Sequence, residues 1–349
     1  MKAFKSKLVI FIFLLIITNL LFSFVSTNEI SGPVTTIKGI TVVAPPKKIG
    51  APAFKKITSI HTEWVSFVPY GFIKKGTSEI RHNLEWQWWG EKKEGVECCV
   101  MEAKDQGLKV MLKPQIYIGG GWIGDLNFDN EMDWQNWEKQ YRKYIFEYVD
   151  IAVKHQVEML CIGTEINHSV EKRPQYWKTL ISDIRKKYSG KLTYSANWDH
   201  YRKVSFWKDL DFVGISSYFP LTDDKNPQLT DLQQEWKPIS KTLKSFSGKT
   251  GKKILFTEYG YMSVDGCAGK VWEIEKNKDQ LQINNKAQAN AYDALWSSLS
   301  KETYWAGGFL WKWFPDGMGH EGYPEKDYTP QGKPAELIIK KWFYHNRKI

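Results

Sequence analysis

The segment EMLCIGTE, residues 158–165, is a short apolar run that closes on a charged residue, Glu165. KILFTEY, residues 253–259, repeats this pattern around Glu258. Apolar runs of this length, without alternating polar residues, predict strands that are buried on both faces, as in a parallel sheet. Further runs of the same kind, with helices between them, would indicate an α/β fold.

Six more β-rich runs occur, and most are separated by amphipathic helix candidates. The other runs are GITVV (39–43), EWVSFVP (63–69), LKVMLKPQ (108–115), LTYSANW (192–198), DFVGISSY (211–218) and GGFLWKW (307–313). The helix candidates span residues 92–106, 134–155, 174–188, 231–246, 285–300 and 334–346. Eight strands alternating with helices predict an α/β chain folded as a single (β/α)8 TIM barrel.

An open doubly wound sheet is the alternative arrangement of such strands. It usually carries a glycine-rich phosphate turn after the first strand. Here that turn is VVAPPKK, residues 42–48, which has two prolines and no glycine. The glycine cluster at residues 119–121 lacks the Lys-Ser/Thr of a phosphate loop, so we interpret it as a flexible loop at the active site.

The N-terminal segment predicts a secretory leader. Lysines at positions 2, 5 and 7 precede an apolar run over residues 8–25, so we expect residues 1–27 to be a signal peptide, with an uncleaved membrane anchor as the alternative. Residues 28–38 follow as a linker, and residues 39–349 form the catalytic domain. We expect a secreted or periplasmic monomer that contacts the membrane only if the leader stays attached.

Composition narrows the function classes. The chain of 349 residues is 42% hydrophobic and 25% charged, which is typical of a globular protein. The net charge of +10 is spread over mixed segments without a nucleic-acid-binding motif, so we expect no nucleic-acid partner. The aromatic content is high, with 17 Trp, 17 Tyr and 18 Phe, which fits a bulky core or the stacking of rings on sugars.

The four cysteines do not predict a metal site. Cys98, Cys99, Cys161 and Cys267 show no CxxC or Cys/His ligand spacing. Cys161 lies inside an apolar run, which is typical of a core residue. A disulfide between Cys267 and one of the adjacent pair stays open in an oxidising compartment.

The two terminal glutamates carry the predicted chemistry. Catalytic side chains of such barrels lie at the C-terminal ends of the strands, and a buried carboxylate without a partner is costly. Glu165 and Glu258 would therefore face one barrel mouth. Paired carboxylates are the groups that hydrolyse glycosidic bonds, without a metal or an organic cofactor.

The chain resembles the clan A glycoside hydrolases, and within them family 113. The resemblance rests on KGITVVAP (38–45), IGTEIN (162–167), FTEYGY (256–261) and GGFLWKWFPD (307–316), and it covers most of residues 37–345. It implies a retaining endo-β-glycosidase acting on β-linked polysaccharide, chiefly an endo-β-1,4-mannanase. A β-glucanase or another β-hexosanase of the clan is the first alternative, and a non-catalytic carbohydrate-binding barrel is the second.

The resemblance also implies residue roles. Glu165 would be the general acid/base and Glu258 the nucleophile. Tyr218 would hydrogen-bond the nucleophile, and Trp311 would floor the subsite where the bond breaks. Many clan members have Asn before the acid/base, where this chain has Thr164.

The contact of that missing Asn with the sugar 2-hydroxyl would have to come from another residue. We name Asn167 and Asn197 as candidates. Lys113, near the end of a predicted strand, would be a salt-bridge partner, a sugar ligand or both. Trp198, at the end of another predicted strand, and Trp122, beside the three glycines, are candidate sugar ligands. A further aromatic loop, which would stack on sugars or pack on other loops, contains Trp86, Trp88 and Trp89.

Overall fold

The computed structural model describes residues 36–315 and 324–345. The predicted leader, residues 1–27, and the linker as far as residue 35 lie outside the described residues. The first strand begins at Ile37, so the last two residues of the predicted linker belong to the barrel. Among the described residues, no helix has the length and apolarity that crossing a membrane requires.

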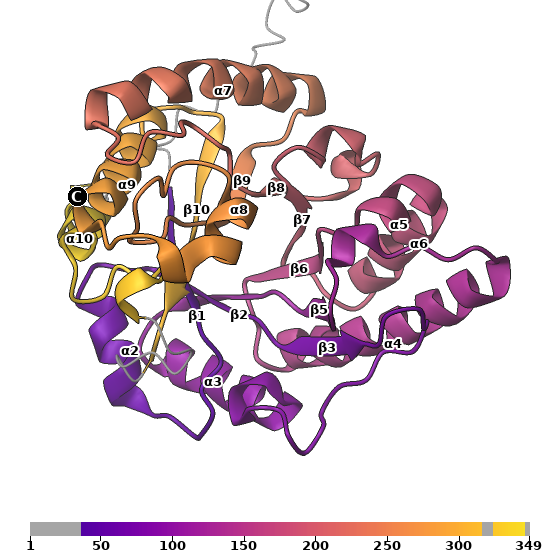
Figure 1. Ribbon diagram of the computed structural model, residues 1–349. Helices are drawn as coiled ribbons and strands as arrows, with labels where there is room; N and C mark the ends of the chain where they lie inside the picture. The colour runs from indigo at the N-terminus through magenta and orange to yellow at the C-terminus, as the bar shows by residue number, and fades with distance from the viewer. Residues whose placement is uncertain (1–35, 316–323, 346–349) are drawn as a thin grey trace, which may run out of the picture. The chain divides into compact units, whose positions relative to one another are not determined.

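Eight parallel strands close into a barrel, which confirms the predicted sheet (Figure 1). Around the barrel the order is β1-β10-β9-β8-β7-β6-β4-β2, so each strand pairs with the next barrel strand along the chain and the last pairs with the first. The strands are β1 (Ile37–Val42), β2 (Trp64–Phe67), β4 (Lys109–Leu112), β6 (Met159–Thr164), β7 (Lys191–Asn197), β8 (Val213–Ser216), β9 (Ile254–Tyr259) and β10 (Trp305–Trp313).

Helices follow the strands, as in a (β/α)8 barrel. The six predicted helices are present as α3 (Lys93–Asp105), α4 (Glu131–Lys154), α6 (Pro174–Arg185), α7 (Leu229–Thr250), α9 (Asn285–Leu299) and α10 (Pro334–His345). Three short helices were not predicted: α2 (Ala51–Thr58), α5 (Asn167–Lys172) and α8 (Val271–Asn277). Short 3-10 turns are η1 (Trp89–Glu91), η2 (Ile123–Asp125), η3 (Tyr201–Lys203), η4 (Trp207–Asp209), η5 (Lys278–Gln280) and η6 (Pro324–Lys326).

Two further strands, β3 (Tyr70–Ile73) and β5 (Gln115–Ile118), extend the sheet beyond the barrel. They pair in parallel, with Tyr70 opposite Gln115, in the same register that pairs Phe67 with Leu112 in the barrel. Pro69 and Pro114 lie at the break between the two ladders, where proline cannot donate a hydrogen bond. The β2–β4 ladder therefore continues past the barrel mouth as a two-stranded wall.

The core accounts for much of the aromatic excess. Five tryptophans have almost no exposed surface: Trp137, Trp177, Trp236, Trp296 and Trp305. Along α4, buried Trp134, Trp137, Tyr141, Tyr144 and Tyr148 recur at helical spacing and form one face. This face covers the outside of the barrel, while Cys161 packs in a separate cluster with Met111, Met159 and Phe309. All four cysteines are free, so the structure holds no disulfide involving Cys267.

Candidate active site

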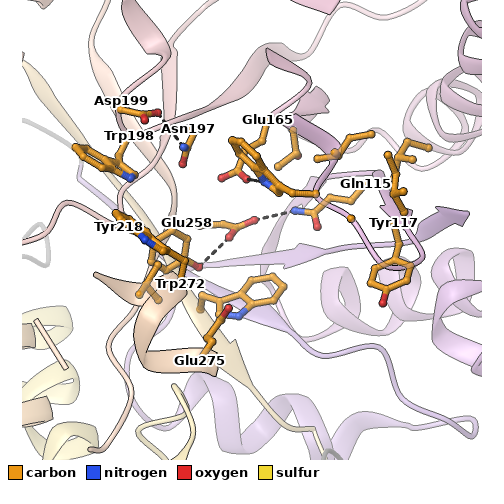
Figure 2. A pocket seen from close by; sticks show the side chains of 18 of the residues that line it. Gln115, Tyr117, Glu165, Asn197, Trp198, Asp199, Tyr218, Glu258, Trp272 and Glu275 are labelled. Carbon is orange, nitrogen blue, oxygen red and sulfur yellow. Dashed lines mark hydrogen bonds between the residues drawn. The ribbon is translucent and has the colours of Figure 1, made fainter. Parts of the chain in front are cut away.

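A cavity of about 870 Å³ lies where the barrel strands end, and Glu165 and Glu258 both line it (Figure 2). Glu165 directly follows β6, and Glu258 is the second-last residue of β9. Other residues that line the cavity come from β3, β5, β7, β10 and α8, and from the loop that carries Trp122. The barrel topology thus brings together two glutamates that lie 93 positions apart in the sequence.

Glu258 is buried, and three side-chain donors hold its carboxylate. The side chain of Lys113, fully buried at the end of β4, forms an ion pair with Oε1. Gln115 Nε2 donates to the same oxygen at 2.8 Å, and the Tyr218 hydroxyl donates to Oε2 at 2.9 Å (Figure 2). A carboxylate that is positioned and charge-compensated in this way is suited to act as an oriented nucleophile.

The surroundings of Glu165 favour its protonated form, unlike those of Glu258, where three donors hold the carboxylate. Burial and the negative charge of Glu258 raise its pKa to about 7, although hydrogen bonds from Trp122 and Ser216 and the charge of Lys113 oppose the shift. The indole N–H of Trp122 donates to its Oε2 at 2.9 Å. A carboxyl group that holds its proton near neutral pH can serve as a general acid.

The backbone at Glu165 is also unusual. Its φ of 56° lies in the left-handed region, which is rare for residues other than glycine. Its N–H donates to Ser195 O at 2.7 Å, while its own carbonyl accepts from Asn167 N at 2.9 Å. The turn that ends β6 and begins α5 therefore forms at this residue. Such outliers gather at functional sites, which supports a role for Glu165 beyond packing.

Aromatic residues surround Glu258. Burial and the charge of Glu258 raise the pKa of Tyr218 well above its usual value, so its hydroxyl stays protonated and donates. The Tyr328 ring lies edge-on to Tyr218, with 6.2 Å between ring centroids. Trp311, half-buried in β10, lines the cavity, and its ring centroid is 5.5 Å from Lys113 Nζ. Tyr218 thus makes the predicted hydrogen bond to Glu258, and Trp311 lines the same cavity, where its role as the floor of a subsite stays a prediction.

Three further predicted ligands also reach the cavity. Asn197, the last residue of β7, lines it, and its Nδ2 donates to Asp199 Oδ1 at 2.9 Å. Trp198 stacks on Trp272 of α8, with 6.1 Å between centroids and 6° between planes. Trp122 lines the cavity while it contacts Glu165. Polar and aromatic groups thus face the same space as the glutamate pair.

Two predicted sugar ligands are placed elsewhere. Lys113 has no exposed surface and is not among the cavity-lining residues, because its ammonium group is used in the ion pair with Glu258. Asn167 starts α5, is buried and does not line the cavity either. Thr164, the residue in the usual Asn position, does line it. The structure therefore gives Lys113 the expected salt-bridge role rather than a direct contact with sugar, and it places Asn167 away from the cavity surface, where a direct contact was expected.

The three tryptophans of the aromatic loop after β3 lie in three different environments. Trp86 is 63% exposed and packs on Phe72, with 4.7 Å between ring centroids. Trp88 lines a separate small cavity of about 60 Å³, and Trp89 packs against the core. None of these three tryptophans is among the described residues that line the main cavity.

Sequence reasoning missed several cavity residues. Tyr117, Trp272, Glu275 and Tyr328 line the cavity, and the Tyr328 hydroxyl donates to Glu275 Oε1 at 2.6 Å. They lie on β5, on α8 and in the segment after residue 324, none of which is a predicted barrel strand. Tyr117 and Trp272 are exposed aromatic residues in the structure, but exposure cannot be read from the sequence. Within residues 36–315 and 324–345, no cluster of three or more His, Cys, Asp or Glu residues could hold a metal ion.

One family model and several solved structures are similar to this chain. The family model described as Glycoside Hydrolase Family 113 matches residues 48–333. A family 113 β-mannanase from Alicyclobacillus acidocaldarius superposes with a TM-score of 0.77 at 22% identity, covering 89% of this chain and 98% of that one. A family 113 β-1,4-mannanase superposes with a TM-score of 0.72 at 26% identity, covering 88% and 99%.

More distant structures share only the fold. A Bifidobacterium dentium β-glucuronidase superposes with a TM-score of 0.57 at 13% identity, covering 89% of this chain and 46% of that one. No curated protein matches the chain in a sequence comparison.

Proposed function

Because the chain belongs to glycoside hydrolase family 113, we propose that this hydrolase is a retaining endo-β-1,4-mannanase. The observation that carries the proposal is the contrast between two carboxyl groups in one cavity. Glu258 is held by Lys113, Gln115 and Tyr218, whereas burial and the nearby charge favour the protonated form of Glu165. Carboxyl groups held in contrasting states have separate acid and nucleophile roles.

The reaction takes two displacements. Glu258 attacks the anomeric carbon while Glu165 gives its proton to the departing glycosidic oxygen, which leaves a glycosyl ester on Glu258. The ester carries no charge, so one of the two effects that raise the pKa of Glu165, the negative charge of Glu258, is removed, while the effect of burial stays. Glu165 then accepts a proton from water, the water oxygen attacks the anomeric carbon, and Glu258 leaves as a carboxylate.

Tyr218 and Trp311 have supporting roles in this proposal. The Tyr218 hydroxyl fixes one oxygen of Glu258, so that the attacking oxygen points along a single direction. Trp311 supplies the apolar floor on which the sugar ring lies. The specificity for mannan over other β-glycans is supported by the family 113 β-1,4-mannanases that the chain resembles.

Hydrolysis of a polysaccharide panel tests this proposal. We expect the wild type to cleave β-1,4-mannan faster than β-1,4-glucan, and we expect Glu165→Gln and Glu258→Ala to lose this activity. Glu235→Gln, which changes an exposed glutamate on α7 outside the cavity, is the matched control and should keep wild-type activity. Faster cleavage of β-glucan would replace the substrate assignment, and full activity in both active-site variants would refute the roles given to the two glutamates.

The proposed place of action is outside the cytoplasm, since polysaccharides are too large to reach an intracellular enzyme. This proposal rests on the leader expected at residues 1–27. Mass spectrometry of the secreted protein would identify its first residue. A mature chain that begins near residue 28 supports a signal peptide, whereas an intact N-terminus in the membrane fraction supports the anchor.

A further inference from the structure

The two-stranded wall formed by β3 and β5 has two unlike faces. Gly71, Ile73, Ile116 and Ile118 are buried, whereas the alternating residues point the other way. The buried face packs on α4, where a Cβ added to Gly71 would lie 3.3 Å from the Tyr144 ring. The opposite face carries Tyr70, Phe72, Gln115 and Tyr117.

That face starts at the reaction centre. Gln115 donates to Glu258, and Tyr70, its partner in the register, lines the cavity. Tyr117 lies two residues farther along β5, which at the usual rise of a parallel strand is about 7 Å beyond Gln115. Tyr117 also lines the cavity, and Figure 2 shows its side chain beyond Gln115, away from Glu258. One sheet face therefore runs from the nucleophile to the outer cavity.

Aromatic side chains cover the outer end of this face. Phe72 lies opposite Tyr117, with 5.9 Å between ring centroids, and Trp86 packs edge-on against Phe72. Tyr117 is 52% exposed and Trp86 is 63% exposed, so both rings present much of their surface to solvent. Exposed apolar groups that adjoin a binding cavity mark a site for a ligand with an apolar face.

We propose that Phe72, Trp86 and Tyr117 form a distal subsite, which binds a hexosyl unit of the β-linked polysaccharide remote from the bond that is cleaved. The inference rests on the proposed function for the identity of the polysaccharide. The C–H face of a pyranose ring suits aromatic side chains, and continuity with the cavity allows one sugar chain to occupy both places. The three side chains carry no charge, which suits a neutral sugar.

Kinetics on a short and a long substrate test the subsite. For Trp86→Ala and Tyr117→Ala we expect the KM for mannohexaose to rise about three- to tenfold, the range expected for losing one aromatic contact, with kcat unchanged. For Trp86→Ala, whose side chain does not line the cavity, the KM for a trisaccharide that reaches only the reaction centre should not change. Tyr117→Phe, which keeps the ring, should behave as the wild type.

Tyr344→Ala is the matched control, because Tyr344 is a tyrosine of similar exposure, 56%, that does not line the cavity. Equal effects on short and long substrates, or no effect on either, would overturn the subsite. If the wild type cleaves no mannan, the proposed substrate fails instead. The subsite can then still be tested by binding, with the Glu258→Gln variant run in native gels that contain β-mannan or β-glucan. If the subsite exists, the double variant Glu258→Gln, Trp86→Ala should be retarded less by the polysaccharide than Glu258→Gln alone.

Discussion

The indole nitrogen of Trp122 lies 2.9 Å from Oε2 of Glu165 and donates a hydrogen bond to it. This bond joins the candidate acid/base to the loop that follows Gly119, Gly120 and Gly121. Trp122 is 41% exposed, so the contact lies at the open side of the cavity. The hydrogen bond favours the ionised form of Glu165 and opposes the larger effects that raise its pKa.

Trp122→Phe removes this hydrogen bond and keeps an aromatic ring. Without the bond, the pKa of Glu165 should rise above its value of about 7 in the wild type. The protonated acid is the active form, so kcat/KM of the wild type should fall as the pH rises through this pKa, and the fall should move to higher pH in the variant. A pH profile of kcat/KM would measure this shift, and a shift to lower pH would contradict the assigned role of Trp122.

Tyr218→Phe deletes one donor to Glu258 and leaves the ring in place. Hydrogen bonds to charged groups contribute about 1.5–3 kcal/mol, so we expect kcat to fall about ten- to hundredfold. Tyr304→Phe is the matched control, because the Tyr304 hydroxyl also bonds a side chain, Ser240, outside the cavity. Equal activity in the two variants would show that Tyr218 does not assist the nucleophile.

Lys113 and Glu258 should be coupled in stability. Breaking a buried ion pair by removal of one partner costs about 3–5 kcal/mol, because the other charge is left without compensation. We expect Lys113→Met and Glu258→Gln each to lower the free energy of unfolding, and the double variant to lose less than the sum of the two. Denaturant unfolding of all four proteins measures this coupling. Strict additivity would mean that the two side chains do not interact.

The raised pKa of Glu165 has a cost in stability with a defined sign. The unfolded chain ionises this group near the ordinary value of 4.5, whereas the folded protein resists ionisation up to about pH 7. The wild type therefore loses stability from this group as the pH rises from 4.5 to 7. Glu165→Gln should be more stable than the wild type at about pH 8, with the difference vanishing below the ordinary pKa. Equal stability of the two proteins at the higher pH would contradict the pKa shift.

Much of the barrel could be predicted because its strands are apolar runs buried on both faces. The runs that contain Glu165 and Glu258 became β6 and β9 with nearly unchanged bounds. The wall of β3 and β5 was missed because each strand has only four residues and directly follows a proline. Gln115 was counted at the end of the preceding run, although it begins the new strand.

Some residues of the candidate site could likewise be predicted from the sequence, and others could not. Residues that end barrel strands could be placed at the mouth, and Tyr218, Asn197 and Trp311 do line the cavity. Position along a strand left two roles open for Lys113, a salt-bridge partner or a sugar ligand, and it did not identify Glu258 as the partner that the structure shows. The cavity residues on α8 were missed because this seven-residue helix is too short to give a clear pattern.

The stereochemistry of the first product tests the central claim most directly. Proton NMR, recorded in the first minutes of mannohexaose hydrolysis and before mutarotation, would identify the anomer that the enzyme releases. Double displacement through Glu258 predicts that the β-anomer appears first and the α-anomer grows in later. Initial release of the α-anomer would show inversion, and it would contradict the assignment of Glu258 as a covalent nucleophile.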